Sequence, residues 1–349
     1  MRLIANTTQG LAYQRQQMVD PYLRHPTLVP PPRAKRLGSL LILLFLGIVW
    51  GLSFSLARMA TESGIHPLMI NYWSCLIGAS LLSPYCLFTK QIPPITRSLI
   101  GFYFICALLG SVVPGTVYFY AAAHVSAGVL SITIATVPLL TFIAAAIFRI
   151  ETLSYKRILG ILCGISSIGL LVLPDSSLPD PKAAPWVIMM VLAAACYAAE
   201  GLVIATRAPP RVNVFVVVTV VLITAVIVMT PIVWLTGTFE VMPWPFSRSS
   251  WAILGMSVIM ATAYGAFYYL IVLAGPVYAS QTAYLITLSG VLWGILIYDE
   301  THSAWTWVSL AVMMIALTLV KPQEATHQGQ RYQNKGKIPV TLPGTNGES

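Results

Sequence analysis

Charged side chains are scarce in this sequence of 349 residues: Asp, Glu, Lys and Arg make up 9% of it, and hydrophobic residues 57%. Soluble globular domains carry about 25% charged residues. A chain of this length with so few charges lacks the polar surface that keeps a domain dissolved. The composition therefore argues against an ordinary soluble enzyme or binding domain and indicates a protein whose solvent is lipid.

Side chains that build metal centres and disulfide frameworks are also few. The five cysteines all lie inside apolar runs, and none forms a CxxC or other metal-ligand spacing. The five histidines fall at helix ends, in loops or in the terminal segments, and no HExxH motif occurs. We therefore predict no metal and no cofactor, and we interpret the cysteines as small buried hydrophobic residues.

What the sequence has instead is ten apolar runs that match, or nearly match, the roughly 20 helical residues needed to cross about 30 Å of hydrocarbon. The runs are continuously apolar rather than alternating, which indicates helices and not barrel strands. They cover residues 37–56, 67–88, 100–120, 126–147, 158–173, 185–206, 212–235, 251–273, 277–298 and 305–320. We predict an all-α integral membrane protein with ten transmembrane helices.

The terminal segments differ from this apolar part. Residues 1–36 are basic and rich in proline, with no apolar core of their own, and residues 322–349 are polar. We expect both to be disordered tails, and the first of them not to be a signal peptide.

Basic residues are distributed unevenly over the connections between the runs. Only Arg58, Lys182 and Arg248 fall on one side of the predicted membrane, which leaves 17 of the 20 Lys and Arg on the side of the tails. Cytoplasmic segments of membrane proteins carry such an excess. We therefore expect a multi-pass protein of the cell (inner) membrane with both termini in the cytoplasm. Because the basic residues are spread over many loops, we expect no nucleic-acid partner.

The sequence repeats itself weakly at an offset of 149 residues. ETLS at 151–154 corresponds to ETHS at 300–303, and each tetrapeptide lies between two apolar runs. Each half, 37–173 and 185–320, then holds five helices, and because five is odd the second half must be inserted upside down. Inverted repeats of this kind are a recurring plan of secondary transporters. The same offset pairs Tyr120 with Tyr269, Ser131 with Ser280, Thr133 with Thr282, and Leu139 with Leu288.

Three stretches carry a resemblance to a known family. The first run contains GIVWGLSFSLAR, the third and fourth contain YFYAAAHVSAGVLSITIATVPLLTFIAAAIFRIETLS, and the second half contains AGPVYASQTAYLITLSGVLWGILIYDETHS. In these stretches the chain resembles the EamA family of the drug/metabolite transporter superfamily, although Thr287 stands where the first half has Pro138. The resemblance implies ten helices, an inner-membrane location and export of small metabolites, often amino acids.

We therefore predict a secondary transporter that exports small metabolites such as amino acids by alternating access, and not an enzyme. No GxxxxGK[ST] loop for ATP is present. The alternatives are an intramembrane enzyme, for which the sequence offers no nucleophile–base pair, and a channel, for which it offers no filter motif. The expected partners are the lipid bilayer and a small-molecule substrate; a homodimer is compatible with the sequence but not required.

Glu200 is the acidic residue that lies inside an apolar run, six residues before its predicted end. A carboxylate within hydrocarbon costs several kcal/mol and normally faces a cavity, a partner or a proton path. Glu200 could bind a substrate ammonium group or take up a coupling proton. It could also be a structural carboxylate bonded to neighbouring helices.

Two further glutamates, Glu151 and Glu300, open the repeated tetrapeptides. A carboxylate in the first turn of a helix satisfies free backbone N–H groups and favours the helix dipole. We predict this capping role for both, as equivalent landmarks of the two halves. Arg58, at the end of the first run, could meet a carboxylate or extend to the membrane surface.

Polar and aromatic residues inside the runs form the predicted substrate cavity. Such groups could instead make hydrogen bonds between helices or form the aromatic belt at the membrane surface. Pro114 and Pro138 interrupt two of the runs, as happens near binding sites in many transporters. The predicted cavity residues are Glu200, Trp50, Tyr197, Tyr118, Tyr264, Gln281 and Tyr284.

Overall fold

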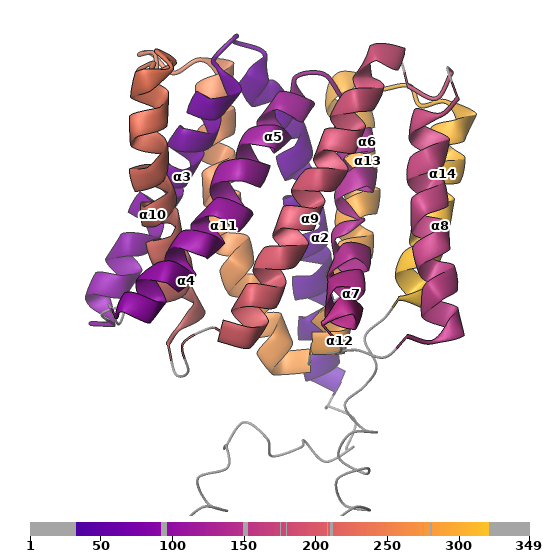
Figure 1. Ribbon diagram of the computed structural model, residues 1–349, viewed down its shortest axis with the longest axis horizontal. Helices are drawn as coiled ribbons and strands as arrows, with labels where there is room; N and C mark the ends of the chain where they lie inside the picture. The colour runs from indigo at the N-terminus through magenta and orange to yellow at the C-terminus, as the bar shows by residue number, and fades with distance from the viewer. Residues whose placement is uncertain are drawn as a thin grey trace, which may run out of the picture. The chain divides into compact units, whose positions relative to one another are not determined.

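The computed structural model describes residues 33–320 except 92–95, 149–152, 175, 179, 208, 210–211, 275 and 280. The predicted tails therefore lie almost wholly outside the described residues. The described residues divide at Leu40 into two units, and the features of interest lie in the second. The helices are α2 (Arg33–Thr61), α3 (Pro67–Phe88), α4 (Arg97–Ala107), α5 (Val113–Ala122), α6 (Ala127–Ile134), α7 (Val137–Ile147), α8 (Tyr155–Val172), α9 (Ala184–Arg207), α10 (Val214–Leu235), α11 (Arg248–Ala274), α12 (Pro276–Ala279), α13 (Thr282–Tyr298) and α14 (Ala304–Leu319) (Figure 1).

The described part of the chain contains helices, turns and loops, and no strand. Seven of its helical segments are long and apolar enough to cross a membrane, and 282–298 and 304–319 are shorter apolar helices. The fold class is therefore an all-helical membrane protein. The first helix extends beyond the predicted run at both ends, from Arg33 to Thr61. The ninth predicted run is divided into α12 and α13.

Prolines mark the irregular points of two predicted runs, as the sequence suggests. Before Pro114 the helix widens into a π-helical turn, Leu108–Val112, which joins α4 to α5. Proline has no N–H to donate, and its ring would collide with the carbonyl four residues earlier, so a wider turn relieves the conflict. Pro138 acts similarly, because α6 ends at Ile134 and α7 begins at Val137.

Helices from the two halves of the chain pack against each other. The pairs are α3 with α10, α6 with α13, and α8 with α14, and Figure 1 shows the last pair side by side. Between α8 and α14 the hydroxyls of Ser167 and Ser309 each donate to the other's backbone carbonyl, both at 2.8 Å. Such small polar residues let helix backbones approach closely in a membrane.

The contact between α2 and α13 depends on glycine. A Cβ atom on Gly51 would overlap the Ser289 hydroxyl and lie 2.8 Å from the Gly290 amide nitrogen. We expect Gly51→Ala to lower the free energy of unfolding by about 1–3 kcal/mol, because it overpacks this contact. Gly101→Ala is the control, because nothing lies within 4 Å of a Cβ there. Thermal unfolding in detergent measures both; equal melting temperatures for the two variants would refute the packing argument.

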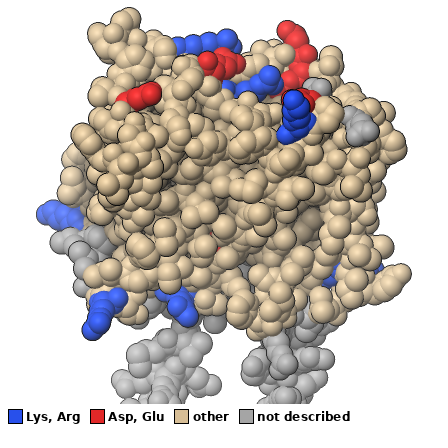
Figure 2. Space-filling view, turned by 45° about the horizontal axis from the view of Figure 1, so that its top comes forward, with Lys and Arg blue, Asp and Glu red and all other residues tan. Residues whose placement is uncertain are grey.

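Charged side chains gather at the ends of the helices. On the face shown in Figure 2, acidic and basic side chains lie together at one end, the visible charges at the other end are basic, and the band between is uncharged. We call the end that holds the last turn of α2, with Arg58, the Arg58 end, and the end that holds the last turn of α9, with Arg207, the Arg207 end. Near Arg58 lie Asp180, Asp299 and Glu300, which line one pocket with it; Glu62, which pairs with Arg248; and Glu240, in the connection between α10 and α11.

Candidate functional site

A cavity of about 370 Å³ lies among α2, α3, α9, α10 and α11, the π-helical turn and α5. Four of the predicted cavity residues line it: Glu200 and Tyr197 on α9, Trp50 on α2 and Tyr118 on α5. Its lining runs from these residues to Ile204, within one turn of the Arg207 end of α9. The cavity therefore reaches from the middle of the helices toward the Arg207 end.

Glu200 lies directly against the π-helical turn. A Cβ atom on Gly110 would overlap the Glu200 carboxylate, so only glycine at that position leaves room for it. Among the described residues, none forms an ion pair with Glu200 and none donates a hydrogen bond to its carboxylate. A carboxylate at this depth without a counter-charge is costly, and this cost makes it a candidate for binding a cation or a proton.

Asn71, on α3, is a lining residue that the sequence reasoning missed. It is buried, and its side-chain amide donates to the Ser111 carbonyl at 2.9 Å and to the Thr116 hydroxyl at 3.1 Å. These bonds tie α3 to the irregular turn and satisfy backbone groups that a regular helix would have paired internally. Asn71 could have been recognised in the sequence, because burying an amide side chain inside an apolar run costs free energy and such residues usually have a role.

Two aromatic side chains of the cavity are held in place by neighbours. The indole N–H of Trp50 donates to the Met260 sulfur at 3.1 Å, and its ring meets Phe267 edge to face. The Tyr118 hydroxyl donates to the Ser53 carbonyl at 3.5 Å, a long bond. These rings give the cavity apolar walls of fixed orientation.

Two of the other predicted cavity residues do not join this group. Gln281 and Tyr284 are not among the described residues that line the cavity. The division of the ninth run explains Gln281, which takes the N-cap position of α13, while Tyr284 packs against the main hydrophobic core. Tyr264 belongs to α11, and its side chain lies outside the described part of the structure.

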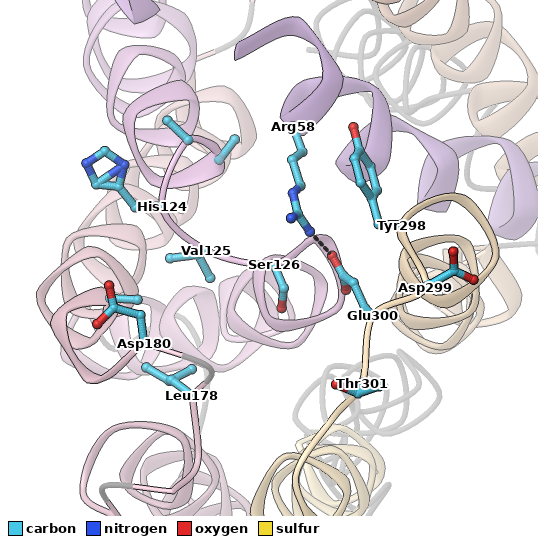
Figure 3. Close-up of a pocket in the computed structure, with 13 residues that line it drawn as sticks. Arg58, His124, Val125, Ser126, Leu178, Asp180, Tyr298, Asp299, Glu300 and Thr301 are labelled. Atoms are coloured by element: carbon cyan, nitrogen blue, oxygen red, sulfur yellow. Dashed lines mark hydrogen bonds and ion pairs between the residues drawn. The ribbon is translucent and has the colours of Figure 1, made fainter. Parts of the chain in front are cut away.

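At the Arg58 end, four residues form a compact polar cluster that we call the Arg58–Glu300 cluster: Arg58, Tyr298, Glu300 and His302. Figure 3 shows the first three of them. An Arg58 guanidinium nitrogen lies 2.5 Å from the Glu300 carboxylate, whose side chain is only 5% exposed. The guanidinium carbon sits 4.3 Å from the centre of the Tyr298 ring. The cluster closes α2 onto the α13–α14 connection beside a second pocket of about 330 Å³.

Glu300 caps a helix, but not the one predicted. Its carboxylate accepts hydrogen bonds from the Ala127 and Gly128 amides, at 2.8 and 3.1 Å, which open α6. The prediction that it caps its own helix is wrong, because Asp299 adopts a left-handed conformation that turns the connection toward α6. Its own helix, α14, is capped by Ser303 instead. The other predicted capping residue, Glu151, lies outside the described residues.

His302 completes the Arg58–Glu300 cluster. Its Nε2 atom lies 3.5 Å from a Glu300 carboxylate oxygen. Burial lowers the pKa of His302 below its usual value, and the nearby Glu300 charge only partly opposes this shift. Burial thus disfavours the charged form of His302, and the Arg58 guanidinium is the positive charge that pairs with Glu300.

The comparisons with known proteins agree with a membrane transporter. The chain is 28% identical over 280 residues to the uncharacterized inner membrane transporter YedA of Escherichia coli K12, covering 80% of this chain and 89% of YedA. It is 26% identical over 121 residues to the WAT1-related protein At1g43650 of Arabidopsis thaliana, covering 34% of this chain and 35% of that one.

One solved crystal structure shares the fold, with a TM-score of 0.55, 17% sequence identity, and coverage of 82% of this chain and 97% of that one. The model of the EamA-like transporter family matches residues 37–173 and 184–321. These two segments span most of the sequence. The chain is therefore a member of the EamA-like transporter family.

Proposed function

We propose that the protein is a secondary transporter that exports small metabolites through the Glu200 cavity by alternating access. The observation that carries the proposal is a half-buried carboxylate, Glu200, without a described counter-charge in an aromatic-walled cavity between helices of both halves. Such midplane sites, built around an irregular helix, bind substrates and coupling ions in secondary transporters. Glu200 is proposed to bind the substrate or the coupling proton.

Ten membrane crossings in two inverted repeats are part of the proposal. The three crossings beyond the seven long apolar segments are α3, α13 and α14. The offset of 149 residues relates Ser167 in the first half to Ala316 in the second, and Gly160 in the first half to Ser309 in the second. It also relates Arg58 to Arg207, which lie at opposite ends of the helices. Ser167 contacts Ser309, and a Cβ on Gly160 would lie 3.1 Å from the Ala316 carbonyl oxygen. A contact and its repeat-related counterpart thus both occur, as a two-fold relation requires.

The orientation follows from the charges. Excess Lys and Arg mark the cytoplasmic side, so we propose that the Arg207 end and both termini face the cytoplasm in an inner membrane. The cavity then reaches toward the cytoplasm, and the Arg58–Glu300 cluster closes the opposite end. The proposed domains are the two repeats, 37–173 and 185–320, between cytoplasmic tails.

An intramembrane enzyme or a channel is the alternative. The membership of the EamA-like transporter family and the name of YedA favour transport, and export of amino acids is the finer possibility that the family resemblance raises. The proposed partners are the bilayer and a small-molecule substrate, without nucleic acid; a homodimer is compatible with the proposal.

Metabolite release from cells that overproduce the chain tests the proposal. We expect Ser74→Trp to abolish release, because Ser74 lines the cavity and an indole there would fill it. Ser80→Trp is the matched control, because Ser80 is an exposed residue of the same helix whose hydroxyl also donates to the carbonyl four residues earlier. Mass spectrometry of the medium, with immunoblots for membrane insertion, measures both.

If release persists with Ser74→Trp, this cavity is not the transport path. No released metabolite with the inserted wild-type chain would remove the support for export.

A further inference from the structure

The chemistry of the cavity restricts what it can bind. Resting on the proposed transport function, we propose that the substrates are amines: molecules with one cationic nitrogen, an apolar or aromatic body and no carboxylate. The inference comes from the charges, the hydrogen-bonding groups and the rings that line the cavity.

The charged residues that line the cavity favour a cationic ligand. Among the described residues that line the cavity, Glu200 is acidic and none is Lys, Arg or His. The described cations nearest in sequence to lining residues, Arg58 and Arg207, belong to helix ends. A buried anion is stable when a positive group compensates it, and an ammonium group on the ligand can do so. A zwitterion such as an amino acid also brings a carboxylate, for which no described lining residue provides a positive charge.

Most hydrogen-bond donors that line the cavity are already bonded within the protein. Three lining serines, Ser53, Ser74 and Ser257, donate their hydroxyl protons to backbone carbonyls of their own helices. The Asn71 amide donates to the π-helical turn, and the Trp50 N–H donates to Met260. With these donors occupied, the groups that remain for a ligand are mainly acceptors; the hydroxyl of Ser111, which also lines the cavity, can both donate and accept. An acceptor-rich wall suits an ammonium group, which has only donors, and does not suit a carboxylate, which has only acceptors.

The aromatic walls and the volume of the cavity suit a small molecule with a flat apolar body. Trp50, Tyr118 and Tyr197 line the same cavity as the carboxylate. Aromatic faces attract cations and pack against flat apolar bodies. A volume of about 370 Å³ lies near the lower end of the range of small-molecule pockets, about 300–1,000 Å³, which favours a small amine over a large drug.

Binding to the purified full-length chain tests the inference with probes that differ by one group. 2-Phenylethylamine and L-phenylalanine share the amine and the ring, and only the second has a carboxylate; 3-phenylpropionate has the carboxylate alone. We expect calorimetry to show binding of the amine, with the amino acid at least about tenfold weaker and the acid weaker still, because each carboxylate would be buried beside Glu200 without a partner. Glu200→Gln should reduce the affinity for the amine by a similar factor.

Binding of phenylalanine as tight as that of phenylethylamine would overturn the inference, and this comparison needs no variant to fold. The metabolite profile separates this failure from failure of the proposed function. Release of carboxylates through a cavity that Ser74→Trp blocks would refute the amine inference and leave transport standing. Release of amines together with tighter binding of phenylethylamine would support both.

Discussion

Glu200→Gln is expected to lower the transport rate at least tenfold in proteoliposomes that hold the purified protein. Glutamine keeps the size of the side chain but removes the charge that lies against the π-helical turn at Gly110. Hydrogen bonds to charged groups are worth about 1.5–3 kcal/mol, and about 1.4 kcal/mol corresponds to a factor of ten. The substrate for the assay is the metabolite that the whole-cell profile identifies.

The control for Glu200→Gln is Glu62→Gln. Glu62 is 39% exposed at the Arg58 end and lies 3.8 Å from Arg248, so its neutralisation should leave the rate unchanged. The same vesicles test proton coupling. If Glu200 carries the proton, an imposed pH gradient should accelerate the wild type and have no effect on Glu200→Gln. A variant that transports at the wild-type rate, with the wild-type response to pH, would exclude Glu200 from binding and from coupling.

Glu300→Ala is expected to destabilise the protein by about 3 kcal/mol or more, because it removes two hydrogen bonds to a charged group, each worth about 1.5–3 kcal/mol. The change removes the partner of Arg58 and also two hydrogen bonds from the first amides of α6. Arg58→Ala should cost less, because Glu300 would keep both amide bonds. Thermal unfolding in detergent measures the order of the two variants.

Glu62→Ala provides the comparison for this series, because the Glu62–Arg248 pair is partly exposed and pairs of that kind contribute about 0–1 kcal/mol. Equal losses for Glu62→Ala and Glu300→Ala would show that the Arg58–Glu300 cluster does not hold α2, α6 and the α13–α14 connection together.

The helices of this protein could be predicted closely from the sequence because lipid imposes a simple rule. A segment that crosses hydrocarbon must pair its own backbone groups, so apolar length alone locates most of the helices. The interruptions at Pro114 and Pro138 were visible for a local reason, the missing proline N–H. The division of the ninth run was not predicted, because no proline stands between Ala279 and Thr282.

Those residues of the site could be predicted whose burial in hydrocarbon costs free energy whatever surrounds them. Glu200 can be recognised in the sequence because a carboxylate in hydrocarbon costs several kcal/mol unless it has a partner or a cavity. It lines the cavity together with Trp50 and Tyr118. The partner of Glu300 was not predictable, because the left-handed Asp299 directs the carboxylate to α6, whose amides are distant in sequence. Asn71 was overlooked although the same cost argument applied to it.

Transport through the Glu200 cavity requires a water-filled path to it from the Arg207 end. The direct measurement is the reaction of Ser74→Cys with a membrane-impermeant maleimide, in a chain whose five native cysteines are alanine and in sealed vesicles of known orientation. The thiol should react from the face that carries Arg207, and bound substrate should slow the reaction. A thiol that reacts from neither face in folded protein, yet fully after unfolding, would show that no such path exists.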